Sequence, residues 1–107
     1  MFSQNFNINS LELGYGKDRT SSISSGDIDS DGDIDLIIAN GRHWPGQNKI
    51  LLNNGLGRFT VEKNLGIDRM TSYAAELGDL NGDGYVDIAF GNDKAPNNIF
   101  INDGLGN

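Results

Sequence analysis

Two short windows of the sequence, residues 27–35 and 79–87, hold eight of its twelve aspartates. Both follow the spacing Asp-x-(Asp or Asn)-x-Asp-Gly-x-x-Asp, which places an oxygen donor at positions one, three, five and nine. A hard cation such as Ca²⁺ takes six to eight oxygen ligands, and alternate residues of a tight loop can turn their oxygens toward one centre. The windows therefore predict two Ca²⁺ sites, since Mg²⁺ keeps its waters and seldom uses an all-protein cage.

The first window is expected to bind its cation through five residues. Asp27, Asp29 and Asp31 supply side-chain oxygens from positions one, three and five. Asp33 at position seven supplies its backbone carbonyl, and Asp35 at position nine closes the site. The glycine at position six permits the sharp turn with positive φ that this loop needs.

The second window repeats the pattern with one uncharged ligand. Asp79, Asn81 and Asp83 stand at positions one, three and five, and Asp87 stands at position nine. Tyr85 at position seven supports the carbonyl assignment, because its side chain cannot act as a carboxylate. Ligand charge tunes affinity. The first loop, which has one more side-chain carboxylate ligand, is therefore expected to bind Ca²⁺ more tightly.

The acidity of the chain is local to these windows. The net charge is −7, and taking away the eight aspartates of the windows leaves +1. Carboxylates a few ångströms apart repel one another, so they take up protons or loosen the loop unless a cation lies between them. The charge distribution thus favours two cation sites over a solvated acidic face.

The rest of the composition excludes several classes of function. The few Lys and Arg residues form no cluster of the kind that nucleic acid or an anionic membrane surface requires, and no apolar run is long enough for membrane insertion. The chain has no cysteine, which excludes disulfides, thiolate zinc sites and thiol catalysis. The serines of residues 21–25 lack a nearby histidine, and the paired carboxylates lie inside the cation loops, so no enzyme activity is expected.

The chain repeats itself at a period near 50 residues. Residues 26–35 match residues 78–87 at an offset of 52, and residues 50–57 match residues 99–106 at an offset of 49. The difference falls in one loop, which is longer in the first repeat. Such a period is typical of propellers and other repeat arrays.

Each repeat contains short apolar runs bounded by Gly, Asn and Asp, which predict antiparallel strands. No stretch shows helical periodicity. We therefore expect an all-β fold of propeller blades with four strands each. Strands are predicted over residues 20–25, 36–39, 49–53, 59–62, 72–77, 88–91 and 98–102. Aromatic core positions are predicted at Phe59, Tyr73, Phe90 and Phe100.

Two other calcium loops begin in the same way but continue differently. An EF-hand needs a bidentate Glu at position twelve between two helices, whereas position twelve is Ile38 in one loop and Phe90 in the other. A dockerin-type loop also needs an acid there and a following helix. Here position nine leads directly into a strand, which places the predicted calcium sites in β-hairpin connections.

These features together resemble a known family. The Asp-rich loop, the following strand that ends in Ala-Asn or Gly-Asn, and the segment NKILLNNGLGRF are similar to FG-GAP repeats, also called VCBS repeats. The resemblance covers nearly the whole chain, and integrin α-subunit headpieces share the fold. It implies a β-propeller whose four-stranded blades hold calcium in the loop between their first two strands. It implies no particular substrate, because propellers host many functions.

Strand counting predicts about two blades, one of them complete and one split between the termini. Residues 1–13 are expected to form the last strand of a preceding blade, residues 14–65 a complete blade, and residues 66–107 a blade without its last strand. The remaining blades are expected from one of two sources. They lie either in cis, elsewhere in a longer polypeptide, or in further copies of the chain through homo-oligomerisation. The first is favoured, because a secreted or cell-surface protein is expected and no signal peptide is visible.

The loop face opposite the calcium loops is a candidate ligand surface. His43 and Trp44 lie in the longer loop of the first repeat, where an exposed Trp could stack on a carbohydrate or contact a protein ligand. The interpretation that the sequence favours is a Trp that covers the end of the blade, with Pro45-Gly46 making the turn. The function expected is thus a structural and partner-binding calcium module. The alternatives are a non-catalytic segment of a secreted polysaccharide-degrading enzyme and an adhesion or receptor headpiece.

Overall fold

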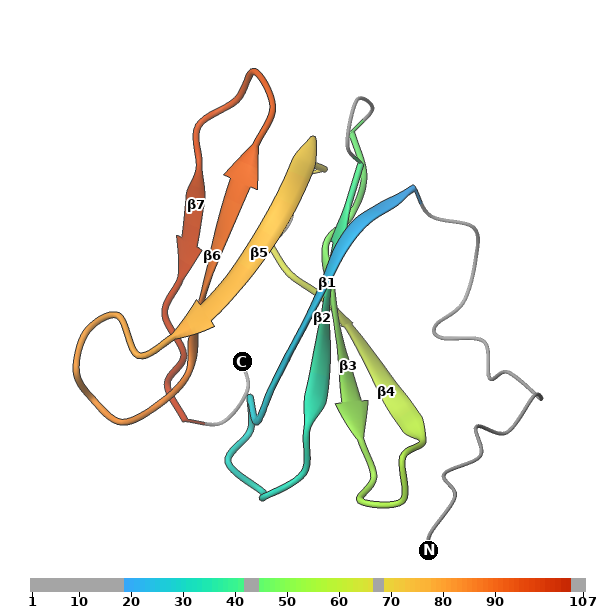
Figure 1. Cartoon of the computed structure of the whole chain (residues 1–107), viewed down its shortest axis with the longest axis vertical. Coiled ribbons are helices and arrows are strands. Elements are labelled where there is room, and N and C mark those ends of the chain that lie inside the picture. Colours follow the sequence, from blue (N-terminus) through green and yellow to red (C-terminus); the bar gives the residue numbers. More distant parts are fainter. Residues whose placement is uncertain (1–18, 42–44, 67–68, 105–107) are drawn as a thin grey trace, which may run out of the picture.

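Two antiparallel sheets make up the computed structural model, which describes residues 19–41, 45–66 and 69–104. In both sheets the spatial order of the strands follows the chain (Figure 1). The first sheet contains β1 (Thr20–Gly26), β2 (Asp35–Asn40), β3 (Lys49–Asn53) and β4 (Phe59–Asn64). The second contains β5 (Ser72–Gly78), β6 (Asp87–Asn92) and β7 (Asn98–Phe100).

The all-β prediction is confirmed, and all seven predicted strands are present with ends within two residues of those expected. β7 ends at Phe100, whereas β3 continues to Asn53 through its pairing with β4; within the described residues no strand pairs with the other edge of β7. Two open sheets do not form a closed ring, so the propeller arrangement stays a prediction. The blade boundaries 14–65 and 66–107 also stay predictions, and the strand expected within residues 1–13 lies outside the described residues.

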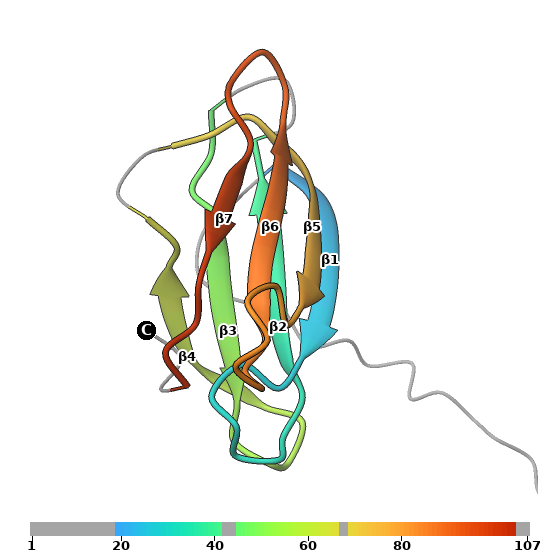
Figure 2. The ribbon, with the colours of Figure 1, turned by 90° about the vertical axis from the view of Figure 1, so that its left-hand side faces the viewer.

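The two sheets pack face to face, with β5 beside β1 and β2 (Figures 1 and 2). The buried core between the sheets contains Ile28, Ile37 and Ile50 of the first repeat. Ala75 and Phe90 come from the second sheet, and burial of this apolar surface is the main force that holds the sheets together.

The predicted aromatic core is partly wrong. Phe90 is 1% exposed, and its ring meets that of the partly buried Phe100 edge to face, with centroids 5.8 Å apart. Phe59 is half-buried. Tyr73 is 38% exposed, because β5 turns Ser72 and Ala75 toward the first sheet, which leaves Tyr73 on the surface.

The serines of β1 have a structural role in joining the sheets. The hydroxyl of Ser21 donates to the backbone carbonyl of Ser72, and the hydroxyl of Ser24 donates to that of Ala75. A hydroxyl-rich strand thus satisfies backbone carbonyls of the neighbouring β5 at the contact between the sheets. These bonds give Ser21 and Ser24 a structural role at the contact between the sheets.

The buried edge-to-face contact predicts a large cost for removing the Phe90 ring. Phe90→Ala is expected to lower the free energy of unfolding by about 3–5 kcal/mol, because it removes buried apolar area and leaves a cavity. Urea denaturation followed by circular dichroism measures this loss. Leu56→Ala is the matched control, since Leu56 is 83% exposed; equal losses in the two variants would contradict the packing described.

Candidate metal centre

The two acidic windows form equivalent loops at the same end of the molecule. The first joins β1 to β2 and the second joins β5 to β6, both at the lower end in Figure 1. The glycine at position six has a φ of 90° in both loops, as the spacing predicts. Each window thus makes a tight connection between two antiparallel strands.

A buried aspartate at position nine anchors the first loop. Asp35 is fully buried at the start of β2. One of its oxygens accepts the N–H of Ile28 within the loop, and the other accepts the N–H of Asn53 at the end of β3, both at 2.9 Å. The carboxylate therefore ties the loop to the third strand of its own sheet.

Asp87 makes the same pair of bonds in the second loop. It is fully buried, and its oxygens accept the N–H groups of Leu80 and Asn102, both at 2.8 Å. A buried carboxylate is costly unless its oxygens are hydrogen-bonded, and bonds to a charged acceptor are strong. The same two hydrogen bonds occur in both repeats, so the aspartate at position nine has a structural role in each loop.

The aspartate at position one organises the turn of each loop. Asp27 accepts the N–H groups of Asp31 and Gly32 at 3.1 and 2.9 Å. Asp79 accepts three N–H groups, from residues 82, 83 and 84, at 2.8–3.1 Å. These bonds lower the pKa of Asp79 below its usual value, the bond from Gly84 contributing most. These hydrogen bonds favour the ionised form of Asp79, and they fix the position-one side chain in both loops.

Position three of the first loop holds a carboxylate oxygen without a hydrogen-bond partner. Oδ1 of Asp29 is buried and accepts no hydrogen bond from the described residues. Burial raises the pKa of Asp29 above its usual value, and the nearby acidic groups of Asp31 and Asp35 add to the rise. A buried anionic oxygen among other carboxylates is the environment that a cation would stabilise. The donor set therefore fits Ca²⁺.

The carboxylates converge in both loops. Oxygens of Asp27, Asp29 and Asp35 lie within 4.8 Å of one another. The same holds for Asp79, Asp83 and Asp87 in the second loop. Each trio spans the loop from its first to its ninth position, which gives a hard cation three anionic donors at one point.

Two more predicted ligands of the first loop lie elsewhere in it. Asp31 is exposed, and its Oδ1 accepts the N–H of Asp33 at 2.8 Å. The side chain of Asp33 lies against Gly55 of the β3–β4 hairpin. The Asp33 carboxylate is therefore beside the hairpin, which agrees with the prediction that the backbone carbonyl of Asp33, and not its side chain, binds the cation.

The second loop shows corresponding positions for Asn81 and Tyr85. Oδ1 of Asn81 accepts the N–H of Asp83 at 3.3 Å, and Oδ1 of Asp83 accepts the N–H of Tyr85 at 2.9 Å. The ring of Tyr85 lies against Gly104. The full ligand sets of both loops stay predictions.

Sequence reasoning missed the asparagines that complete the loops. The side-chain amide of Asn53 donates to the carbonyl of Ile34 at 2.9 Å. Asn102 donates likewise to Val86 at 2.9 Å and also to Ile28 across the sheets at 2.6 Å. The signal was present, because Asn53 and Asn102 correspond at the repeat offset of 49.

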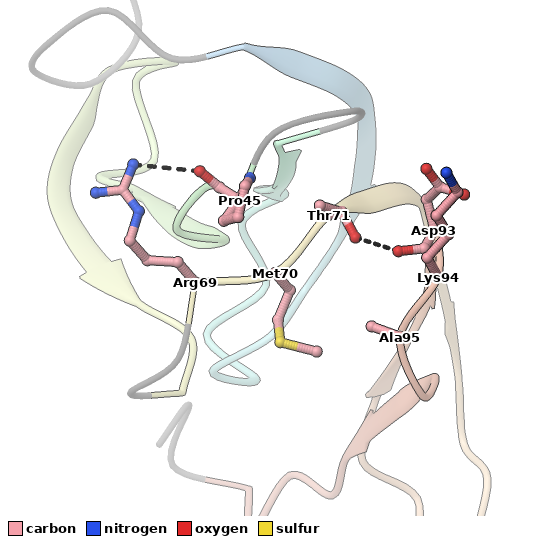
Figure 3. Close-up of a pocket in the computed structure, with 7 residues that line it drawn as sticks. All are labelled: Pro45, Arg69, Met70, Thr71, Asp93, Lys94 and Ala95. Carbon is pink, nitrogen blue, oxygen red and sulfur yellow. Dashed lines mark hydrogen bonds between the residues drawn. The ribbon is translucent and has the colours of Figure 1, made fainter.

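A pocket of about 370 Å³ lies at the opposite end of the molecule (Figure 3). It is lined by Pro45, Arg69, Met70, Thr71, Asp93, Lys94 and Ala95. The Arg69 guanidinium donates to the carbonyl of Pro45 at 3.3 Å, and the hydroxyl of Thr71 donates to the carbonyl of Asp93. His43 and Trp44, the predicted ligand residues of this loop face, lie outside the described residues.

Comparison with known proteins gives one match. A family model for FG-GAP-like repeats matches residues 27–90, from the first aspartate of the first loop through the second loop and into β6. No curated protein and no solved structure matches the chain. Within the described residues, no helix is long and apolar enough to cross a membrane.

The anchoring role of position nine can be separated from cation binding. In the presence of a chelator, Asp35→Asn is expected to lower the free energy of unfolding by about 1.5–3 kcal/mol, because an amide NH₂ would face a backbone N–H donor. Asp31→Asn removes one charge from the same loop but keeps an acceptor oxygen, so it should change stability by about 0.5 kcal/mol or less. Chemical denaturation of both variants checks this, and equal losses would show that Asp35 is not the anchor.

Proposed function

The chain belongs to the FG-GAP-like repeat family, and from this premise we propose that it is a calcium-binding repeat module of the β-propeller type. The observation that carries the proposal is the buried, unpartnered Oδ1 of Asp29 beside the carboxylates of Asp27 and Asp35. The second loop supports it with a trio of aspartates at positions one, five and nine, since its position three is Asn81. The cofactor is Ca²⁺, one ion in each loop.

Calcium in these loops would act as an electrostatic cross-link. Each carboxylate trio joins residues at the two ends of its loop. Position nine is already bonded to Asn53 at the end of β3 in the first repeat and to Asn102, just beyond β7, in the second. A cation removes the repulsion within the trio. The proposed role is therefore structural, and we propose that the chain carries out no reaction itself.

The proposal includes a partner-binding role in a secreted or cell-surface protein. FG-GAP-like repeats support an extracellular setting, and the pocket beside Arg69 and Lys94 offers room for a ligand on the loop face. The proposed ligand is a carbohydrate or a protein, and its proposed contact residues are His43 and Trp44. A non-catalytic segment of a polysaccharide-degrading enzyme and an adhesion headpiece are the two settings in which such a module would serve.

Removal of calcium should destabilise the protein. A ligand that binds only the folded state contributes about 2.7 kcal/mol per site at a hundredfold excess over its Kd. For a domain of this size each site then corresponds to a rise in Tm of about 10 °C. Thermal denaturation in chelator, in Ca²⁺ and in Mg²⁺ tests the proposal. Identical melting curves in all three would refute calcium binding.

Position three should set the difference in affinity between the loops. Asp29→Asn is expected to weaken the first site by about tenfold or more, and Asn81→Asp to strengthen the second by a similar factor, because each changes one ligand charge. Isothermal titration calorimetry on the two variants and the unchanged chain measures both effects. A first site with unchanged affinity in Asp29→Asn would remove Asp29 from the ligand set.

A further inference from the structure

The second sheet exposes an apolar face that corresponds to the buried face of the first repeat. Ile50 of β3 is 3% exposed, because it packs in the core between the sheets, whereas its counterpart Ile99 of β7 is 62% exposed. In the same way Ile28 is 2% exposed and its counterpart Leu80 is 52% exposed. Ile101 is also 52% exposed. The second repeat therefore presents the contact surface that the first repeat covers with β5 and β6.

The first sheet exposes the surface that complements this face. Ala75 of β5 is 1% exposed in the core between the sheets, whereas its counterpart on β1, Ile23, is 52% exposed. Ile34, which corresponds to the partly buried Val86, is 53% exposed. One chain thus carries both halves of a contact that it already makes once within itself.

We propose that the exposed face of the second sheet, formed by Leu80, Ile99 and Ile101, binds the Ile23 and Ile34 face of a second copy of this chain. The inference deepens the proposed function, on which it rests, by naming the partner of the repeat module. The contact would repeat between two chains the interface that joins the two sheets within one chain. The association is head to tail, and such heterologous contacts close into rings when the rotation fits.

Side-chain sizes favour a copy of this chain as the partner. In the existing interface a large Ile37 on β2 and a small Ala75 on β5 belong to one buried cluster. At the corresponding positions of the proposed interface, a small Ala89 on β6 would meet a large Ile23 on β1 of the partner. The exchange of large and small keeps the filled volume constant, which is the kind of change that a packed core tolerates best.

The polar contacts of the existing interface also have counterparts. The side-chain amide of Asn48 donates to the hydroxyl of Ser72 at 2.8 Å, and this hydroxyl donates to Asn92 at 2.7 Å. In the second repeat Asn97 takes the place of Asn48, its amide oxygen accepting the N–H of Asn92 at 2.9 Å. Asn97 is exposed and thus placed to donate to a hydroxyl of the partner.

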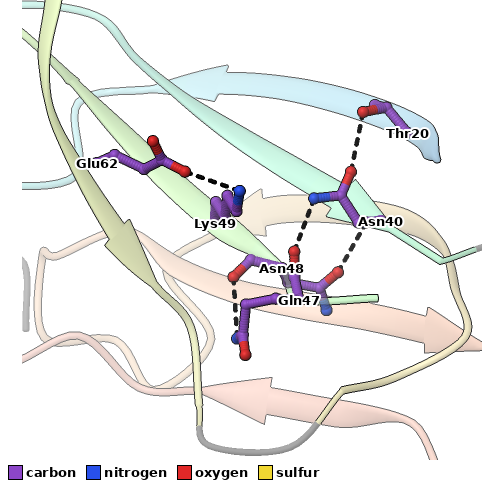
Figure 4. Close-up of polar contacts among 6 residues, drawn as sticks. All are labelled: Thr20, Asn40, Gln47, Asn48, Lys49 and Glu62. Atoms are coloured by element: carbon purple, nitrogen blue, oxygen red, sulfur yellow. Dashed lines mark hydrogen bonds and ion pairs between the residues drawn. The ribbon is translucent and has the colours of Figure 1, made fainter. Parts of the chain in front are cut away.

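The hydroxyl that would receive this bond is that of Thr20, the counterpart of Ser72. Thr20 already donates to Asn40 at 2.9 Å (Figure 4). Ser72 donates to Asn92 in the same way. The hydroxyl oxygen of Thr20 can still accept a hydrogen bond from the partner, as the Ser72 hydroxyl accepts one from Asn48.

Sedimentation velocity over a wide range of concentrations, in saturating Ca²⁺, tests the proposal. The unchanged chain should form a discrete species of three or four times 11.6 kDa, which would bring six or eight sheets into a ring. Ile99→Glu and Ile23→Glu should each be monomeric, because each blocks one half of the contact. Leu56→Glu, at an exposed hairpin position off both faces, should assemble like the unchanged chain.

Mixing the two blocked variants gives the decisive result. Each keeps the half that the other lacks, so an equimolar mixture should form a one-to-one complex and nothing larger. Ile23 and Ile99 are both exposed, so both variants should fold, which circular dichroism verifies. If Ile99→Glu does not fold, Ile101→Glu tests the same face in its place. A monomeric unchanged chain, variants that assemble normally, or a mixture that stays monomeric would each overturn the proposal.

Calcium titration of the same samples keeps this proposal separate from the proposed function. A chain that binds two Ca²⁺ yet remains monomeric at every concentration excludes a second copy as the partner. In that case the exposed face of the second sheet would be covered by a further repeat of a longer polypeptide. A chain that assembles but binds no Ca²⁺ refutes the metal sites and leaves the docking face standing.

Discussion

The geometry of both acidic loops depends on one buried carboxylate in each, which accepts a backbone N–H from the loop and another from the end of a more distant strand. Asp35 joins Ile28 to Asn53 in this way, and Asp87 joins Leu80 to Asn102. Hydrogen bonds to a charged acceptor contribute about 1.5–3 kcal/mol each, which offsets much of the cost of burying the charge. Because position nine is fixed, positions one and three of the first loop are brought toward it, and the convergence of carboxylates follows.

This convergence sets up an electrostatic conflict that the two loops resolve to different degrees. The first buries an unpartnered oxygen of Asp29 near Asp31 and Asp35, and the pKa of Asp29 rises, chiefly through burial and further through these two acidic neighbours. The second carries the neutral Asn81 at the same position, and three backbone N–H groups stabilise Asp79 in its charged form. The first loop therefore has more to gain from a cation. The predicted order of affinities has a structural basis in this difference between repeats.

Much of the architecture could be predicted because its signals are local or periodic. The strands follow from short apolar runs between turn residues, and the repeat offsets of 52 and 49 align them. The exposure of Tyr73 could not be predicted, because it depends on which face of β5 meets β1. The bond from the Asn102 side chain to Ile28 was equally hidden, since it joins residues 74 positions apart. Such contacts depend on how the sheets pack, and no window of sequence contains that information.

The position-nine carboxylates should order the loops before any cation binds, and amide hydrogen exchange measured by NMR in chelator tests this most directly. Each of the four amides that donate to Asp35 and Asp87 should exchange as slowly as the central amides of β2 and β6, since each is bonded to a buried acceptor. Added Ca²⁺ should then shift the resonances of residues 27–35 and 79–87 without changing which amides are protected. Rapid exchange of these four amides in chelator, with protection only after Ca²⁺ is added, would contradict the account, because the cation and not the carboxylate would then order the loops.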